Sequence, residues 1–260
     1  MKKFVALLLA ALMVASLCAC GQKGTGSDLQ TVTKGKLIMS TNAEFAPYEY
    51  VADDGKGFQG TGYEGIDIEI AYALAQKLGL ELVVDNMDFD AALSAVQTGK
   101  SDMVAAGVTV TPDRLNAMSF TDSYANGVQV VIVKEGSDIK SIDDLQGKKI
   151  GTQRGTTGFL YCSDDFGDDN VIGFDDGATA VQNLKAGKVD CVVIDNAPAQ
   201  EYVKANPGLT ILDTEYANED YAIGIAKDNT ALQEALNKAL AELKADGTIQ
   251  SIIDKYIPAK

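Results

Sequence analysis

A sequence unit that occurs twice constrains the fold of this 260-residue chain more than any other feature. Phe-Asp, then Ala-Val-Gln, then Gly-Lys-X-Asp occurs at 89–102 and again at 174–190, with six residues from Phe to Ala in both copies. In each copy we expect a strand to end at Phe-Asp, a helix to bury Ala and Val, Gly to end the helix, and Asp to begin a buried strand. Two similar α/β lobes follow from such a repeat. The alternative is a chance likeness among common residue types.

Strand and helix patterns alternate through the first half of the chain. Strands are expected at 37–40, 81–84 and 103–106, and helices at 67–78 and 91–97. This alternation is typical of a mainly parallel sheet with helices on its faces.

Two short β-prone segments, 128–133 and 221–226, are candidates for hinge strands that link the lobes. Helices are expected at 230–245 and 248–256, and they would return the chain to the first lobe. A chain that crosses twice between lobes leaves a cleft between them, where ligands commonly bind. The predicted division is lobe 1 at 36–126 plus 222–260, and lobe 2 at 127–221.

The N-terminal residues have the pattern of an export signal. Two lysines precede an apolar run that ends at Leu17-Cys18-Ala19-Cys20, and the run is too short to span a bilayer. The pattern resembles a bacterial lipoprotein signal, which implies removal of 1–19, acyl chains such as palmitate on Cys20, and a flexible tether at 20–35. We therefore expect an extracytoplasmic protein that is lipid-anchored to the cell membrane. An uncleaved anchor and an ordinary signal peptide are the alternatives.

Composition excludes several classes of function. The net charge of −15 disfavours nucleic acid as a partner, because it repels phosphate backbones. The chain has no histidine, which excludes a Ser-His-Asp triad, a Cys-His pair and histidine metal sites. Cys162 and Cys191 are the only thiols in the expected folded body. They are interpreted either as buried free thiols or as a disulfide that an exported setting allows.

Arg114 is one of two arginines and closes a segment suited to binding a carboxylate. The segment 106–114 leaves a buried strand, offers the Gly107 backbone and hydroxyls, and starts a helix at Thr111 with Pro112 in its first position. Backbone N–H groups, hydroxyls and a guanidinium at a helix start favour carboxylate binding. The alternative is a surface arginine after an ordinary helix cap.

The second lobe offers a similar arrangement. After the strand at 150–153, a Gly-rich turn leads to Thr156 and Thr157, which either cap a helix or also donate to the carboxylate. The segment lacks the ending of a phosphate loop, so nucleotide binding is weakly supported. Asp195 follows a wholly apolar strand, where open α/β sheets present ligand-binding groups, and an ammonium group would be its natural partner.

The residues quoted so far carry a family resemblance that extends from about Lys36 to Lys260. The chain is similar to the polar amino-acid-binding proteins of ABC importers, which form bacterial extracellular solute-binding family 3 and have the two-lobed type II periplasmic-binding fold. The segment 106–114 is its most specific part. The other matching segments are the lipoprotein signal, 42–48, 65–69, 87–89, 155–158 and Asp195.

The resemblance implies roles for individual side chains. Arg114 would bind the ligand carboxylate with help from Thr109, Gly107 and Thr157, and Asp195 would bind the α-ammonium group. Phe45 and Phe89, which the residues alone favour as core aromatics, would sandwich the ligand side chain. Asn42 stands where several relatives carry an acid, which puts a cationic ligand in doubt unless Glu44 compensates. The predicted ligand-binding residues are Asn42, Glu44, Phe45, Phe89, Gly107, Val108, Thr109, Arg114, Gln153, Thr156, Thr157 and Asp195.

The resemblance further implies a hinged clamp that closes on a free amino acid and then docks on a membrane permease. We expect a monomer that is not an enzyme and uses no cofactor or metal. One alternative is an enzyme on the same fold that resembles secreted cyclohexadienyl dehydratases, with Glu44 or Glu64 as general acid. Another is a receptor module that signals through a partner.

Overall fold

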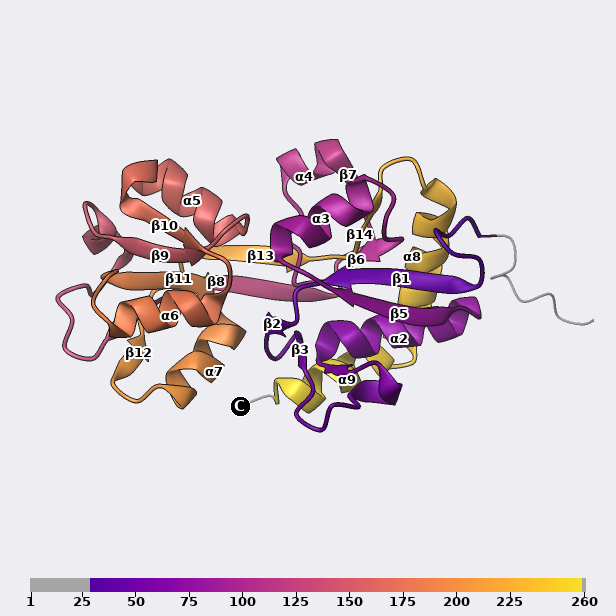
Figure 1. The fold of residues 1–260 in the computed structure, drawn as a ribbon, viewed down its shortest axis with the longest axis horizontal. Coiled ribbons are helices and arrows are strands. Elements are labelled where there is room, and N and C mark those ends of the chain that lie inside the picture. Colours follow the sequence, from indigo (N-terminus) through magenta and orange to yellow (C-terminus); the bar gives the residue numbers. More distant parts are fainter. Residues whose placement is uncertain (1–28, 259–260) are drawn as a thin grey trace, which may run out of the picture.

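The computed structural model describes residues 29–258 as two α/β lobes placed side by side and joined by long strands (Figure 1). The main sheet of lobe 1 has the order β5-β1-β6-β14-β7, and a small sheet has the order β2-β3-β4. The strands of lobe 1 are β1 (Lys36–Thr41), β2 (Glu44–Phe45), β3 (Glu49–Val51), β4 (Tyr63–Glu64), β5 (Glu81–Asn86), β6 (Met103–Val104), β7 (Met118–Phe120) and β14 (Gly224–Ala226). Its helices are α2 (Ile66–Leu78), α3 (Phe89–Gln97), α4 (Pro112–Ala117), α8 (Thr230–Ala245), α9 (Thr248–Tyr256) and the 3₁₀ turn η2 (Phe58–Gly60).

Lobe 2 is built on a sheet with the order β10-β9-β11-β8-β12, and β13 also pairs with β8. Its strands are β8 (Ala125–Lys134), β9 (Ile150–Gln153), β10 (Val171–Phe174), β11 (Cys191–Asp195), β12 (Leu209–Ile211) and β13 (Ala217–Tyr221). Its helices are α5 (Thr157–Phe166), α6 (Gly177–Lys185), α7 (Asn196–Ala205), and the 3₁₀ turns η3 (Ile142–Leu145) and η4 (Asp168–Asn170).

The repeat seen in the sequence corresponds to a repeat in topology. In lobe 1, β1 pairs in parallel with β5 and β6, and in lobe 2, β9 pairs in parallel with β10 and β11. An antiparallel strand follows in both sheets, β14 beside β6 and β8 beside β11. The prediction of two similar lobes is therefore confirmed.

The two copies differ at their first residues. Phe174 ends β10 as predicted, whereas Phe89 is the first residue of α3 and no strand ends there. The chain leaves β5 at Asn86, and Asp88 occupies the cap position before α3, so the helix in lobe 1 starts earlier. After that point the copies agree, because Gly99 and Gly187 follow their helices in left-handed conformations with φ of 70° and 73°.

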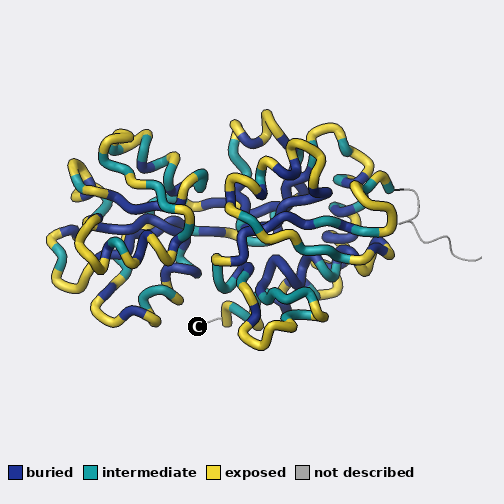
Figure 2. The backbone as a smooth tube through the Cα atoms, viewed as in Figure 1, coloured by how far each residue is buried: buried dark blue, intermediate teal, exposed yellow. Residues whose placement is uncertain are grey.

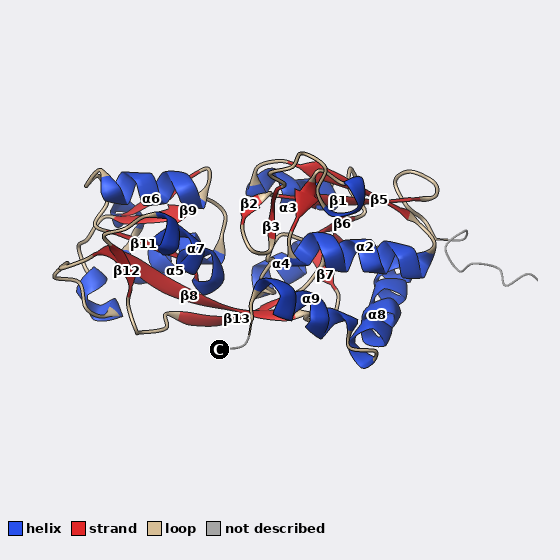
Figure 3. Ribbon diagram, turned by 90° about the horizontal axis from the view of Figure 1, so that it is seen from below, coloured by secondary structure: helices blue, strands red, loops and turns tan. Residues whose placement is uncertain are grey.

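Two antiparallel strands, β8 and β13, run between the lobes (Figures 1 and 3). The first hinge strand was predicted at 128–133 and is longer in the structure. The prediction of the second at 221–226 is wrong. Tyr221 ends β13, and the following β14 belongs to the sheet of lobe 1, where it pairs with β6 and β7. The apolar, β-prone composition of 221–226 reflects burial in that sheet and gives no sign of the crossing.

The helices at the C-terminus have the predicted bounds. Leu232, Leu236, Leu240 and Leu243 recur at helical spacing on α8, and all four are buried. Gly247 separates α8 from α9 with φ of 82°, a conformation that glycine adopts at low cost. Helices α2, α8 and α9 pack against one another on lobe 1 (Figure 3).

Each lobe has its own hydrophobic clusters, and buried backbone runs through both sheets and along the crossing strands (Figure 2). Phe45 connects the clusters of the two lobes, because its half-buried ring packs against one cluster of lobe 1 and one cluster of lobe 2. Phe45 therefore lies where the lobes meet.

The predicted export signal, Cys20 and most of the predicted tether lie outside the described residues. Residues 29–35, which the sequence assigned to the tether, already contact lobe 1, so the prediction that order begins near Lys36 is wrong. Leu29 packs on the core of lobe 1, and the Val32 N–H donates to Asp102 at 2.7 Å. Between residues 29 and 258, no helix is both long and apolar enough to cross a bilayer.

Candidate functional site

Arg114 is a buried cation of lobe 1 whose position follows from local helix chemistry. The Thr111 hydroxyl accepts from the Arg114 N–H at 3.2 Å, which caps α4, and Pro112 fills the first helical position. The guanidinium donates to the Thr109 carbonyl at 2.8 Å and, across to lobe 2, to the Gly155 carbonyl at 3.1 Å. It also lies 5.5 Å from the centre of the Phe89 ring.

No carboxylate among residues 29–258 forms an ion pair with Arg114, although its side chain is only 8% exposed. Burial lowers its pKa, and the nearby Glu219 charge opposes that shift. A guanidinium remains charged under such conditions and presents donors in a fork that fits a carboxylate. Arg114 is therefore suited to an anionic group of a ligand.

Hydroxyl groups from both lobes lie beside this cation. Thr109 and Thr157 are buried, and their Oγ1 atoms are 3.5 Å apart across the lobes. Thr156 caps α5 by accepting from the Phe159 N–H at 3.3 Å, as the capping interpretation of this turn predicted, whereas donation to a ligand carboxylate stays a prediction.

Asp195 is the buried acid of lobe 2 and ends β11. Its carboxylate accepts three hydrogen bonds, from the Tyr221 hydroxyl and the Val128 N–H at 2.9 Å each and from the Ala197 N–H at 3.0 Å. Burial nevertheless raises its pKa to about 6. Within the part of the chain that the structure describes, no lysine or arginine pairs with it. Asp195 is therefore suited to a cationic group of a ligand.

A cavity of about 20 Å³ lies between the lobes. It is lined by Asn42, Phe45, Glu49, Phe89, Ala106, Gln153 and Thr156. Five of these seven residues were predicted from the sequence. A volume of this size holds about one water molecule, so a larger ligand requires the lobes to separate.

Polar contacts close the cavity across the lobes. The Gln153 amide donates to Asn42 Oδ1 at 2.8 Å, and the Asn42 amide donates to the Met87 carbonyl at 3.0 Å. Gly107 has φ of 54°, and a side chain there would meet the Phe45 ring at 2.9 Å. The Gly107 N–H donates to Asp67 Oδ2 at 2.8 Å.

Seven of the twelve predicted residues do not line this cavity, and Asp195 lines a separate pocket together with Tyr48 and Val128. The seven are Glu44, Gly107, Val108, Thr109, Arg114, Thr157 and Asp195. Glu44 is exposed and does not line the cavity, although its carbonyl accepts from the Tyr202 hydroxyl of lobe 2 at 3.2 Å. The Val108 side chain is fully buried in a core cluster of lobe 1, so only its backbone is left to meet a ligand.

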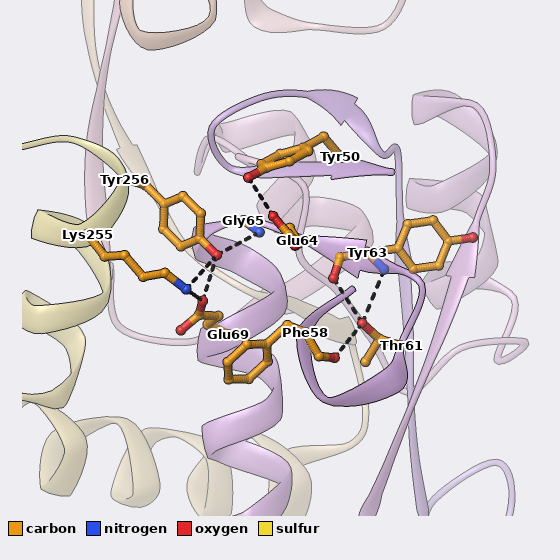
Figure 4. Close-up of polar contacts among 9 residues, drawn as sticks. All are labelled: Tyr50, Phe58, Thr61, Tyr63, Glu64, Gly65, Glu69, Lys255 and Tyr256. Atoms are coloured by element: carbon orange, nitrogen blue, oxygen red, sulfur yellow. Dashed lines mark hydrogen bonds and ion pairs between the residues drawn. The ribbon is translucent and has the colours of Figure 1, made fainter. Parts of the chain in front are cut away.

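Glu64, the second acid considered for catalysis, also lies away from the cavity. It ends β4 and accepts from the Tyr50 hydroxyl at 3.0 Å (Figure 4). The nearby Tyr256 hydroxyl donates to Glu69 at 2.6 Å and accepts from the Gly65 N–H at 3.3 Å, which fastens α9 to the start of α2 (Figure 4). This region serves the packing of lobe 1.

Sequence reasoning missed Glu49, Tyr221 and Gly155. Glu49 directly follows the polar and aromatic segment 42–48 and lines the cavity with both carboxylate oxygens lacking a donor. Tyr221 was assigned only to a hinge strand, yet its hydroxyl supports Asp195. The sequence signal for Glu49 was its position next to segment 42–48, which holds the predicted ligand-binding residues Asn42, Glu44 and Phe45.

Two lobes on crossing strands, with a buried cation on one lobe and a buried anion on the other, define a clamp for a small solute. The chain belongs to the bacterial extracellular solute-binding proteins, family 3, whose family model matches residues 37–259. It is thus a solute-binding protein of the kind that serves ABC importers.

Individual relatives agree with this assignment. The arginine-binding extracellular protein ArtP of Bacillus subtilis is 34% identical, with 98% of each chain covered. A probable histidine-binding protein of Neisseria gonorrhoeae is also 34% identical, over 98% of this chain and 96% of its own. Among solved structures, an ancestral arginine-binding protein bound to arginine is 42% identical, with a TM-score of 0.79, over 86% of this chain and 99% of its own.

Proposed function

We propose that this protein captures a free amino acid with a cationic side chain, arginine in the first place, and delivers it to the permease of an ABC importer. Arg114 binds the ligand carboxylate together with Thr109, Thr157 and the Gly107 backbone. Asp195 binds the α-ammonium group. The observation that carries this proposal is the pair of buried opposite charges, one on each lobe, neither neutralised within the described residues.

Glu49 supports the choice of a cationic side chain. By the family resemblance, Asn42 stands where several relatives carry an acid, which left the charge of the ligand open. Glu49 supplies a carboxylate to the same cavity, is 1% exposed, and has no donor on either oxygen. A buried acid without a partner is costly unless a proton or a cation meets it. The names of two relatives, which specify arginine and histidine, favour the same class.

Ligand entry requires a hinge motion in this proposal. An amino acid is far larger than the 20 Å³ cavity, so the interlobe bonds of Arg114 and Gln153 break and the Phe45 ring moves before the ligand enters. The lobes, at 36–126 plus 222–260 and at 127–221, then close on the ligand through Thr157, Gln153 and Asp195. The closed form docks on the permease.

The N-terminal residues complete the proposal. Removal of residues 1–19 and acylation of Cys20 would hold the protein on the outer side of the cell membrane as a monomer. Intact-mass measurement of the protein from the membrane fraction tests this. We expect the added mass of a diacylglyceryl group on Cys20.

Calorimetric titration with each of the twenty amino acids and cystine tests the ligand assignment. We expect arginine to bind most tightly and Arg114→Ala to weaken it at least about tenfold, because charge-assisted hydrogen bonds contribute about 1.5–3 kcal/mol. Arg154→Ala is the matched control, since that arginine is exposed and pairs with Asp175 at 2.8 Å. Equal affinities in the wild type and Arg114→Ala would refute the carboxylate assignment.

A further inference from the structure

Two acids are buried next to each other at the cavity. Glu49 comes from β3, Asp67 is the second residue of α2, and each is 1% exposed. Glu49 lines the cavity, while Asp67 lies behind it and accepts the Gly107 N–H at 2.8 Å through Oδ2. Both oxygens of Glu49, Oδ1 of Asp67 and the hydroxyl of the adjacent Tyr124 have no fixed donor or acceptor. The two carboxyl groups therefore have oxygens that lack hydrogen-bond partners.

The surroundings of the pair disfavour two negative charges. Burial raises the pKa of Glu49 well above its usual range, and the Asp67 charge adds to the effect. Burial raises the pKa of Asp67 to about 6, although the Gly107 N–H opposes it. The other titratable groups that face the pair are Tyr48 and Tyr124, and burial raises the pKa of both, so they stay neutral. Within residues 29–258 no lysine or arginine forms an ion pair with either acid.

One proton on the pair of carboxyl groups provides a hydrogen-bond donor for these oxygens. Two carboxylates in contact cannot both ionise in a buried site. A proton on Glu49 can supply a donor to Asp67 Oδ1, which has no hydrogen-bond partner. The pair then carries a single negative charge, which the Gly107 N–H partly compensates.

We propose that Glu49 and Asp67 share one proton in the absence of ligand, and that the cationic side chain of the ligand replaces this proton when it enters the cavity. The inference rests on the proposed function, because it requires a cationic ligand. In the exchange the O–H bond of the carboxyl breaks and the proton passes to water. The guanidinium then faces two carboxylates, so the pair and its occupant carry one net negative charge before and after.

Binding is therefore coupled to pH in a defined direction. By linkage, the slope of the logarithm of the affinity against pH equals the number of protons released. The affinity for arginine rises with pH up to neutrality. Citrulline has the same shape without the charge, so it leaves the proton in place and its affinity changes with pH only through groups that both ligands share.

Calorimetry in buffers of different ionisation enthalpy measures the released protons directly. With the full folded protein between pH 6 and 7, we expect arginine to release a larger fraction of a proton than citrulline, approaching one proton. Glu49→Gln removes this difference and lowers arginine affinity at least about tenfold, while citrulline affinity stays within about threefold. Glu64→Gln is the matched control, since that acid lies outside the cavity, and it leaves the proton release unchanged.

The outcomes separate this inference from the function on which it rests. Arginine binding with the same proton count as citrulline overturns the shared proton and leaves the function intact. Release that persists in both Glu49→Gln and Asp67→Asn also overturns it, because other groups then supply the proton. If no cationic amino acid binds, the proposed function fails and the inference fails with it. The wild-type buffer comparison needs no variant, so it decides even if both substitutions prevent folding.

Discussion

The hydroxyl of Tyr221 donates to Oδ2 of Asp195 at 2.9 Å, and both side chains are 1% exposed. Tyr221 ends the hinge strand β13, whereas Asp195 ends the central strand β11 of lobe 2. The bond thus links the hinge to the acid assigned to the ligand ammonium. Gly127, on the other hinge strand, leaves the room for it, since a Cβ there would lie 2.4 Å from the Tyr221 ring and 2.8 Å from Asp195 Oδ2.

Gly127→Ala should therefore disturb this bond from the hinge side. The added methyl group forces Tyr221 or Asp195 to move, and overpacking of this kind costs about 1–3 kcal/mol of stability. We expect ligand affinity to fall more than about tenfold in calorimetry, with a circular dichroism spectrum like that of the wild type.

Asn126→Ala is the control for this substitution. Asn126 precedes Gly127 on the same strand, but its side chain is exposed and bonds Asp220 at 2.6 Å. We expect its affinity to stay near that of the wild type. An unchanged affinity in Gly127→Ala would mean that the Tyr221–Asp195 bond has no part in ligand binding.

Gln153→Ala should shift the protein toward an open form. The Gln153 amide bonds Asn42 across the lobes at 2.8 Å, and a hydrogen bond contributes about 0.5–1.5 kcal/mol net. The ratio of open to closed molecules should rise about threefold to tenfold. Small-angle scattering of the ligand-free protein would then give a larger radius of gyration than the wild type. Arg154→Ala, which removes a bond within lobe 2 only, should leave the radius unchanged.

The sequence predicted those parts of the fold that local patterns specify. The bounds of α8 and α9 agree with the prediction because leucines recur at helical spacing and Gly247 interrupts the pattern. Arg114 and Asp195 were identified because each follows a strand end, where α/β sheets present functional groups.

The remaining features depend on contacts between distant segments. Glu49 lies in a short strand with no local mark of burial, and only the packing of β3 on α2 brings it beside Asp67. The crossing of β13 was misplaced because both β13 and β14 are short, and their partner strands decide which lobe each joins. A local sequence pattern does not specify which strands β13 and β14 pair with.

The two thiols of lobe 2 should resist modification in the folded protein. Cys162 and Cys191 are free, fully buried and part of one hydrophobic cluster. Burial raises the pKa of Cys162 to about 12 and raises that of Cys191 as well, so neither forms the reactive thiolate near neutral pH.

Ellman's reagent measures this protection. In a variant with Cys18 and Cys20 replaced by serine, we expect no rapid reaction in the native state and two thiols per chain in guanidinium chloride. A mass two hydrogen atoms lower under non-reducing conditions would reveal a disulfide instead.

Asp195 should make the ligand-free protein more stable at pH 5 than at pH 7. Its pKa of about 6 in the folded state exceeds the value of 3.8 for an unperturbed aspartate, so the folded state binds more protons between these values. Stability therefore falls as pH rises through that window. The loss between pH 5 and 7 is on the order of 1.4 kcal/mol, since one pKa unit corresponds to 1.36 kcal/mol.

Urea unfolding of the wild type and Asp195→Asn at both pH values isolates this contribution, which the variant lacks. Asp138→Asn, at an exposed position, should keep the pH dependence of the wild type. Ligand affinity should change the opposite way and weaken at pH 5, because protonated Asp195 no longer attracts the ammonium group. A wild type and an Asp195→Asn variant with the same pH dependence of unfolding would contradict the raised pKa of Asp195.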